Sequence, residues 1–225
     1  MITAMSRTVR VTGKGILKVR PDLIRLIITL TGTEKEYSEA LRRSTEDTDA
    51  LKSAMEKLGF RKSDLKTLAF NVDTKYESYR DRNNDYKQRF TGYEFTHQLK
   101  LEFPLDNKLL GKTLYALAHS PVHPEFRIRY TVSDPEGAKN ELLSKAVADA
   151  AAKAEVLTKA ANVKLSDIQS IDYSWGEIDV DLKMMPKLMA DGCDAPMCAE
   201  DAYDIDVDPD DIEVTDTVTV VWEIA

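Results

Sequence analysis

The sequence predicts an α+β fold in which antiparallel sheets are covered by two long helices, at residues 34–59 and 134–161. Apolar residues recur every three or four positions in both segments, which is the spacing of one helix face. Residues 65–79 and 93–103 alternate apolar and polar side chains, as half-buried strands do. The order strand, long helix, strand, strand occurs twice. Together these observations predict a duplicated βαββ unit.

We expect a single domain over residues 6–225 that contains two similar halves. The first half covers 7–103, and the second covers 104–225 and starts with a short connector helix at 107–119. The joins after the two long helices match at an offset of 103 residues, with Gly59 and Asn162 at the helix ends. Both residues tolerate positive φ, and each is followed by an apolar residue and then by Ser-Asp. The alternative is that any two helix-to-strand joins look alike.

The first half opens with alternating apolar residues around Gly13 and Gly15. This pattern predicts either a tight hairpin or one strand with a glycine bulge. Residues 22–31 are apolar on both faces, so we expect a central strand there. A long antiparallel hairpin then follows from residues 65–79 and 93–103.

The second half is organised around its long helix. The helix begins either at Asp134, with Pro135 in its first position, or in a capping box of Ser133 and Glu136. Its predicted buried face is rich in alanine, which lets a helix lie close to the sheet that it covers. That face comprises Leu143, Val147, Ala150, Ala154, Leu157 and Ala161. The chain is predicted to end in a strand at residues 212–224.

Five stretches of the sequence resemble the SIMPL-domain family, a group of bacterial and animal proteins of mostly undefined biochemistry that is related to periplasmic immunogenic proteins. They are VTGKGILKVRPD (11–22), GFRKSDLKT (59–67), TGYEFTHQLKLEF (91–103), SDPEGAKNELLSKAVADAAAKAEVL (133–157) and EVTDTVTVVWEI (213–224). The resemblance covers nearly the whole chain. It implies antiparallel sheets backed by long helices, assembly into rings in some members and a link to the stress response. It implies no catalytic residues.

The composition, 43% hydrophobic and 31% charged over 225 residues, is that of a soluble globular protein. The first residues lack the apolar run of about 7–15 residues that export requires. The most apolar stretch, 23–30, is interrupted by Arg25 and is too short to span a bilayer. Two cysteines do not make a disulfide framework. We therefore predict a cytoplasmic protein without a membrane span, although many bacterial relatives are exported.

The net charge of −8 is unevenly distributed. The last basic residue is Lys187, and twelve acidic residues lie from Asp191 to Glu223. The body of the chain is therefore nearly balanced, and it shows no coherent basic face of the kind that nucleic acids bind. We predict that nucleic acid is not a partner.

The segment 184–211 combines soft and hard metal ligands. Thiol and thioether sulfur suit Cu(I) or another soft metal, and alternating carboxylates suit Ca²⁺. The candidate ligands are Cys193, Cys198, Met197, Asp204, Asp206 and Asp208. The cysteine spacing matches no standard zinc motif, so an acidic flexible loop or a methionine-rich contact surface are the alternatives. A disulfide between the two cysteines is also left open.

The tip of the predicted hairpin mixes aromatic and basic residues. The candidate interface residues are Tyr76, Tyr79, Arg82, Tyr86, Arg89 and Phe90. Tyrosine and arginine are enriched in protein interfaces, and the same mixture stacks on single-stranded nucleic acid. We favour a contact between subunits over nucleic acid, and a plain exposed hairpin is the remaining alternative.

We find no catalytic or cofactor-binding motif. Gly111-Lys112-Thr113 lies inside a predicted helix and lacks the first glycine of a phosphate-binding loop. His97 is expected to be a hydrogen-bonded histidine on the apolar face of a strand. His119 and His123 are interrupted by prolines and are expected in a turn rather than at a zinc ion.

Three functions follow from these observations. The first is a non-catalytic interaction or scaffold protein that assembles with itself, since exposed strand edges invite pairing between subunits; the family resemblance adds the possibility of a ring. The second is a metal- or redox-responsive module built on the segment 184–211. The third is an enzyme with an unrecognised site.

Overall fold

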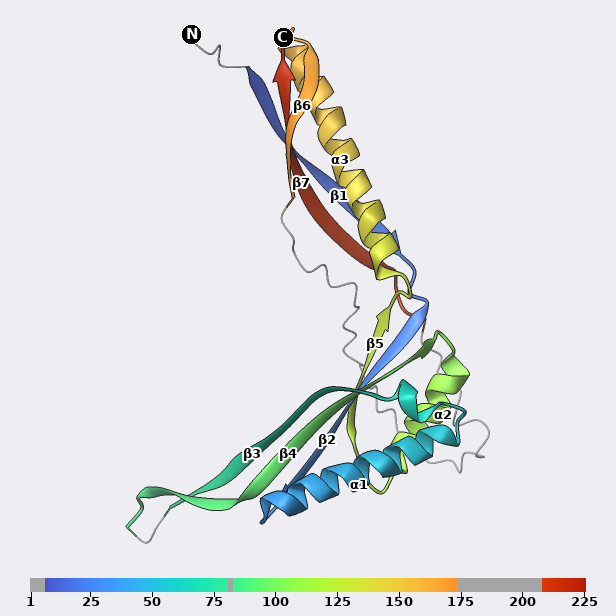
Figure 1. The fold of residues 1–225 in the computed structure, drawn as a ribbon, viewed down its shortest axis with the longest axis vertical. Helices are drawn as coiled ribbons and strands as arrows, with labels where there is room; N and C mark the ends of the chain where they lie inside the picture. Colours follow the sequence, from blue (N-terminus) through green and yellow to red (C-terminus); the bar gives the residue numbers. More distant parts are fainter. Residues whose placement is uncertain (1–6, 81–82, 174–207) are drawn as a thin grey trace. The chain divides into compact units, whose positions relative to one another are not determined.

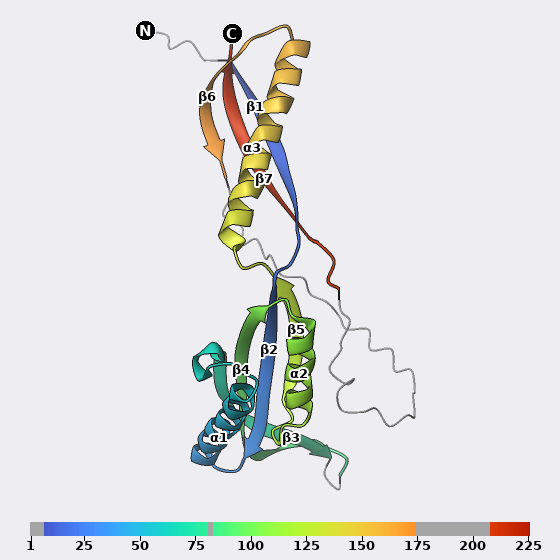
Figure 2. The ribbon, with the colours of Figure 1, turned by 90° about the vertical axis from the view of Figure 1, so that its right-hand side faces the viewer.

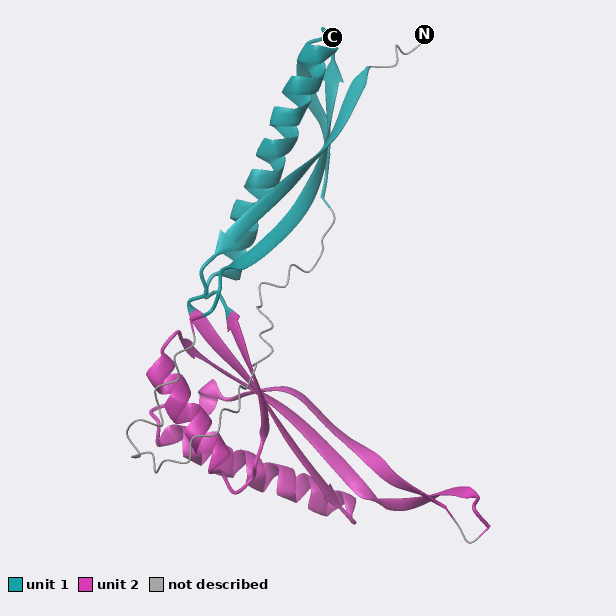
Figure 3. Cartoon of the chain, turned by 180° about the vertical axis from the view of Figure 1, so that it is seen from behind, with its two compact units in different colours: residues 1–22, 131–182, 209–225 teal, residues 23–130, 183–208 magenta. Residues whose placement is uncertain are grey.

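The computed structural model describes residues 7–80, 83–173 and 208–225. Within these ranges the chain forms helices and two antiparallel sheets, which confirms the predicted α+β class. The fold divides into two compact units, shown in two colours in Figure 3. The described part of the first unit is 7–22, 131–173 and 209–225, and the second unit is built from 23–130.

The second unit contains a four-stranded sheet with the order β3-β4-β2-β5. Its strands are β2 (Leu23–Glu34), β3 (Lys66–Arg80), β4 (Tyr86–Pro104) and β5 (Glu125–Thr131). Its helices are α1 (Tyr37–Glu56), the short 3₁₀ turn η1 (Lys62–Asp64) and α2 (Asn107–Ala118). β3 pairs antiparallel with β4 from Lys66 opposite Lys100 to Arg80 opposite Tyr86, which confirms the predicted hairpin, and β2 lies inside the sheet as predicted (Figure 1).

The core of this unit lies on one face of the sheet. Alternate residues of β2 and β4 are fully buried there because helix α1 covers this face. The buried residues from the two strands are Ile24, Leu26, Ile28, Leu30, Phe95, Leu99, Leu101 and Phe103. From α1, Leu51 and Met55 complete the core. The other face carries ion pairs, such as Arg25 with Glu102 at 2.7 Å.

The first unit contains a three-stranded antiparallel sheet with the order β1-β7-β6. Its elements are β1 (Thr8–Val19), α3 (Pro135–Ala160), β6 (Leu165–Asp172) and β7 (Ile212–Ile224). The long helix α3 runs along one face of this sheet (Figure 2). The predicted second long helix and the last strand are therefore both present.

Gly13 and Gly15 serve a purpose that the sequence pattern did not reveal. β1 is one unbroken strand that pairs with β7 from Thr8 to Val19 without a register shift, so the predicted hairpin or bulge is wrong. A Cβ atom on Gly13 would lie 2.0 Å from the carbonyl oxygen of Ala146, and one on Gly15 would lie 2.3 Å from that of Leu142. The two glycines thus allow the backbone of α3 to lie directly on the strand.

The buried face of α3 is rotated from the predicted one. The buried residues are spaced four apart and are Leu142, Ala146, Ala150, Ala154 and Thr158. Ala150 and Ala154 are shared with the prediction, whereas Leu157 is half exposed and Leu143 and Val147 lie at the margin. The close approach at the glycines explains the shift, because only alanine-sized side chains fit where the helix backbone meets the strand.

The helix ends follow the predicted chemistry. Asp134 caps α3 by accepting a hydrogen bond from the backbone N–H of Gly137 at 2.8 Å, while Ser133 bonds to the carboxylate of Asp22 instead. Gly59 and Asn162 both have positive φ, at 95° and 56°. In each case the next residue donates its N–H to a carbonyl five residues earlier, which is the Schellman arrangement.

The two units divide the chain differently from the two sequence halves. β1 pairs in the sheet that α3 covers, whereas β5, which directly precedes α3 in sequence, lies in the sheet that α1 covers. The order β6-β7-β1 in one unit corresponds to β3-β4-β2 in the other, because in both sheets the second strand after the helix lies in the middle. The duplication itself stays a prediction.

Candidate functional site

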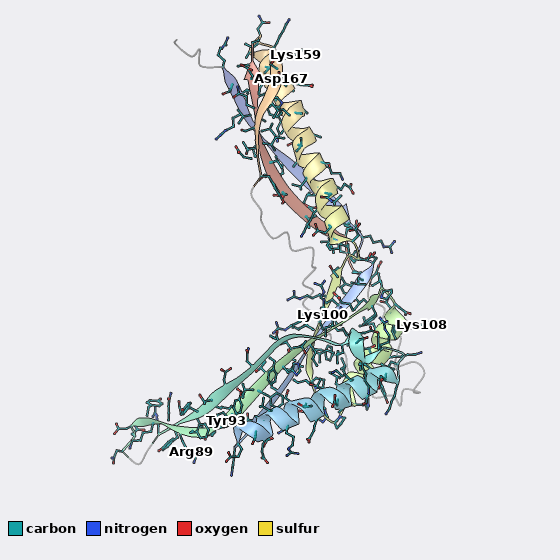
Figure 4. The ribbon with its side chains drawn as sticks, viewed as in Figure 1. Arg89, Tyr93, Lys100, Lys108, Lys159 and Asp167 are labelled. Atoms are coloured by element: carbon teal, nitrogen blue, oxygen red, sulfur yellow. The ribbon has the colours of Figure 1, made fainter. Side chains whose placement is uncertain are left out.

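The hairpin of β3 and β4 continues beyond the rest of its sheet. β2 ends at Glu34, which is paired with Tyr93, and the pairing of β3 with β4 goes on from there to Arg80 and Tyr86. We call the described residues 75–80 and 83–90 the ribbon. In Figure 1 both strands run past the end of α1, and Figure 4 shows Arg89 in the ribbon and Tyr93 beside the helix.

A row of aromatic rings leads from the body of the unit onto the ribbon. Tyr37 at the start of α1 meets Tyr93 edge to face, with ring centroids 5.5 Å apart. Tyr93 meets Phe90 at 5.4 Å, and Phe90 meets Tyr76 on the opposite strand at 5.8 Å. All three contacts are T-shaped, which is a favoured geometry for aromatic pairs.

The aromatic side chains of the ribbon itself remain largely exposed to solvent. The exposed fractions are 56% for Tyr76, 43% for Tyr79, 74% for Tyr86 and 45% for Phe90. A ribbon of two strands has little stability of its own in water. Tyr76, Tyr86 and Phe90 share one face of the ribbon, whereas Tyr79 lies on the other face. Exposed apolar side chains on such a ribbon are typical of an interaction surface.

Charged residues of both signs accompany the rings. Arg89 forms an ion pair with Glu77 at 2.9 Å across the ribbon. The guanidinium of Arg80 lies 4.6 Å from the centre of the Tyr86 ring and donates to its hydroxyl at 2.6 Å. Five of the six predicted interface residues lie on the described ribbon, and Arg82 lies outside the described residues. Of the five, Arg89 and Tyr79 are on one face of the ribbon, and the other three are on the opposite face. Tyr37 and Tyr93, which extend the row, were not predicted.

His97 is held by hydroxyl groups on the inner face of β4. Its Nδ1 atom lies 3.1 Å from the hydroxyl of Thr48 and 3.3 Å from that of Ser44, both on α1. Its Nε2 atom lies 2.9 Å from the hydroxyl of Thr67, and Phe70 meets the ring edge to face. This is the hydrogen-bonded strand histidine that the sequence predicts, and its partners are hydroxyls rather than carboxylates.

The environment of His97 makes folding stability depend on pH. Burial, and then the positive charge of Lys52, lower the pKa of His97 below its usual value of 6.5. Below pH 6.5 the unfolded chain therefore binds a proton that the folded chain does not, and stability falls as the pH is lowered toward the folded pKa.

We expect the replacement His97→Gln to remove this contribution. Denaturant unfolding at a series of pH values below 6.5 should show a shallower loss of stability in the variant than in the wild type. Identical pH dependence in the two proteins would contradict the assignment.

The other two histidines, His119 and His123, do not form a metal site among the described residues. His119 stacks on Tyr115 with ring centroids 3.9 Å apart at the end of α2, and His123 adopts a positive φ of 46° in the following turn. Among the residues that the structure describes, no three His, Cys, Asp or Glu side chains gather to hold a metal ion.

The candidate metal ligands of the segment 184–211 cannot be placed in the same way. Cys193, Met197, Cys198, Asp204 and Asp206 lie outside the described residues, and Asp208 lies exposed just before β7. Metal or Ca²⁺ binding by this segment stays a prediction.

Comparisons with known proteins assign the chain to a family. The model of the SIMPL family, described as a protein of unknown function (DUF541), matches residues 9–222. The 26 kDa periplasmic immunogenic proteins of Brucella melitensis biotype 1 and Brucella abortus strain S19 are each 29% identical to this chain over 171 residues. Each match covers 76% of this chain and 68% of the relative.

A solved structure of CutA from Synechococcus elongatus PCC7942 matches 58% of this chain and 94% of its own chain. The identity is 14% and the TM-score is 0.21. A likeness at this score carries no argument about fold or function.

The relatives correct the predicted location. Both curated relatives are named as periplasmic proteins, so the prediction of a cytoplasmic protein is wrong. That prediction depended on the composition of the first residues, which is weak evidence for where a protein is located. None of the described helices combines the length and apolarity needed to cross a bilayer. Since the family model spans both units, the chain belongs to the SIMPL family of proteins of unknown function.

Proposed function

We propose that this protein is a non-catalytic interaction or scaffold protein of the periplasm that assembles with copies of itself, and that the ribbon is one of its contact surfaces. The observation that carries the proposal is the pair of exposed rings of Tyr76 and Phe90 on a two-stranded extension of the sheet, which the half-buried Tyr93 joins to the body of the unit. The names of the two curated relatives support the periplasmic location.

The charge of the ribbon favours a second copy of the chain as its partner. Between Lys75 and Phe90 the sequence holds five basic and three acidic residues, whereas the whole chain has a net charge of −8. The acidic surplus of the chain lies at residues 191–223, so this segment of one copy attracts the ribbon of another. β3 is also an edge strand of its sheet, and an edge strand offers backbone hydrogen bonds to an added strand.

The test replaces the two facing rings of the ribbon by Tyr76→Ser with Phe90→Ser. Both side chains are already about half exposed, so the fold should be retained, as circular dichroism and thermal unfolding would check. We expect the mass measured by light scattering to fall below that of the wild-type assembly, because the apolar contact between copies is lost.

Phe126→Ser is the matched control. Phe126 lies on β5 at the opposite edge of the same sheet and is 40% exposed, so the substitution removes a similar ring outside the ribbon. It should leave the mass unchanged. The same mass in the double variant and the wild type would exclude the ribbon as a contact, and a wild-type monomer would exclude self-assembly altogether.

A further inference from the structure

The sheet of the first unit has two edge strands, β1 and β6, on either side of β7. β1 is partly protected, because the backbone N–H of Lys14 donates to the carboxylate of Asp149 on α3 at 2.7 Å. In an antiparallel strand, residues two positions apart direct their backbone N–H and C=O groups to the same edge of the strand. The segment from Thr8 to Thr12 therefore directs its alternate N–H and C=O groups to the outer edge as well.

An apolar hollow lies beside this segment of β1. Its volume is about 450 Å³, and it is lined by Val11, Ala152, Lys153, Val156 and Leu157. Val156, near the end of α3, is 69% exposed and is the most exposed large apolar side chain of this lining. The hollow thus offers apolar contacts to side chains of a strand that is added next to β1 on the face that α3 covers.

The opposite edge of the sheet carries apolar side chains that α3 does not cover. Ile168 and Ile171 of β6 are each 51% exposed. They pair with Trp222 and Val220 of β7, both of which are buried under α3. A register shift between Ile168 and Ser170 places the two isoleucines, three residues apart, on this same face of the sheet.

The register aligns the two edges with each other. One row across the sheet runs Val9, Trp222, Ile168, and the next row runs Val11, Val220, Ile171. β1 and β6 are both antiparallel to β7, so they run in the same direction. Consider a second copy in the same orientation, with its β6 next to β1 of the first copy and no shift along the strands. Its Ile168 and Ile171 then lie level with Val9 and Val11 of the first copy, and hence with the hollow.

Charge selects this pairing over the alternatives. β1 holds the three basic residues Arg10, Lys14 and Lys18 and no acidic one. β6 holds Asp167 and Asp172 and no basic residue, and Figure 4 shows Asp167 on this strand. Contacts between two β1 edges or two β6 edges bring like charges together, whereas β1 against β6 brings opposite charges together. The ion pair of Arg10 with Asp172 within one chain spans 3.8 Å between exposed groups and is weak.

We propose that β6 of one copy adds to the β1 edge of the next, with Ile168 and Ile171 filling the hollow beside α3. This inference depends on the proposed self-assembly and assigns it a second contact, distinct from the ribbon. The two surfaces of the contact differ, so it is heterologous, and repetition of such a contact produces a ring or a filament rather than a closed dimer.

Two variants each block one edge. Arg10→Glu with Val156→Asp places acidic groups at the β1 edge, and Ile168→Asn with Ile171→Asn removes the apolar groups of the β6 edge. All four side chains are at least half exposed, so both proteins should fold. Ile16→Asn is the control, because Ile16 is similarly exposed on β1 but faces away from α3.

We expect each edge variant to sediment as a smaller species than the wild type, and the control to sediment as the wild type. Each edge variant retains the edge that the other has lost. An equimolar mixture should therefore form a heavier species that contains both variants in equal amounts, which native mass spectrometry would resolve.

The outcomes separate the two proposals. Edge variants with wild-type mass, or a mixture no heavier than its components, would overturn the pairing of β1 with β6 while leaving assembly through the ribbon intact. A wild type that sediments as a monomer would overturn the proposed function and this contact together.

Discussion

Replacing Gly13 by alanine is expected to destabilise the first unit by about 3 kcal/mol or more, at the upper end of the cost of overpacking a core. The new Cβ would lie 2.0 Å from the carbonyl oxygen of Ala146 and 2.4 Å from the backbone nitrogen of Ala150. Both atoms belong to the backbone of α3, so the helix as a whole must move away from β1. Hydrogen exchange measured by mass spectrometry should show faster exchange in β1, β7 and α3.

A second substitution distinguishes this mechanism from ordinary side-chain crowding. The combination of Gly13→Ala with Ala150→Gly removes the nearest Cβ atom but leaves the two backbone contacts in place. We therefore expect no recovery of stability. Thr12→Ala, on the exposed face of the same strand, is the control and should cost little. Recovery in the double variant would show that the backbone of α3 does not lie on Gly13.

Replacing Phe95 by alanine is expected to destabilise the second unit by about 3–5 kcal/mol, the usual cost of removing a buried phenylalanine. The ring of Phe95 is fully buried and packs against Gly32 on β2, where a Cβ atom would lie 2.5 Å from the ring. The cavity left by the ring lies over the paired strands β2 and β4, on the face that α1 covers, and the paired strands cannot close it without losing their register. Hydrogen exchange should accelerate in β2 and β4.

Two matched variants test the source of this effect. Phe95→Leu keeps most of the apolar volume and should cost much less than alanine. Phe126→Ala removes an exposed ring from the same sheet and should have a small effect. Equal destabilisation by the alanine substitutions at Phe95 and Phe126 would contradict the described core.

Much of the fold could be predicted because local patterns specify single elements. The long helices, the hairpin of β3 with β4 and the final strand all have clear periodicity, and Asp134, Gly59 and Asn162 mark helix ends by their own chemistry. The choice of sheet for β1 and β5 could not be predicted in this way. The alternating pattern of a strand predicts which of its faces is buried, but it does not predict which helix covers that face.

The close packing of α3 on β1 was hidden for a related reason. Gly13 and Gly15 are the usual sign of a turn or bulge in a strand, and the alternative of a helix backbone lying directly on them appears only in three dimensions. The same packing rotates the helix, so a stripe chosen by hydrophobicity alone included Leu157 and missed Leu142.

The candidate site was predicted in part. Aromatic and basic residues of the ribbon stand out in the sequence because they are close together along the chain. Tyr37 joins the row through tertiary contact, and Ile168 and Ile171 share a face only because a register shift separates them. Such relationships require the pairing register, which the spacing of residues does not contain.

Sedimentation equilibrium of the wild-type chain over a wide range of concentrations is the most direct test of self-assembly. We predict a mass that is a multiple of the chain mass of 25.4 kDa and that decreases toward it on dilution or on substitution of Tyr76 and Phe90. A mass of 25.4 kDa at every concentration would contradict the central claim that copies of this chain bind one another.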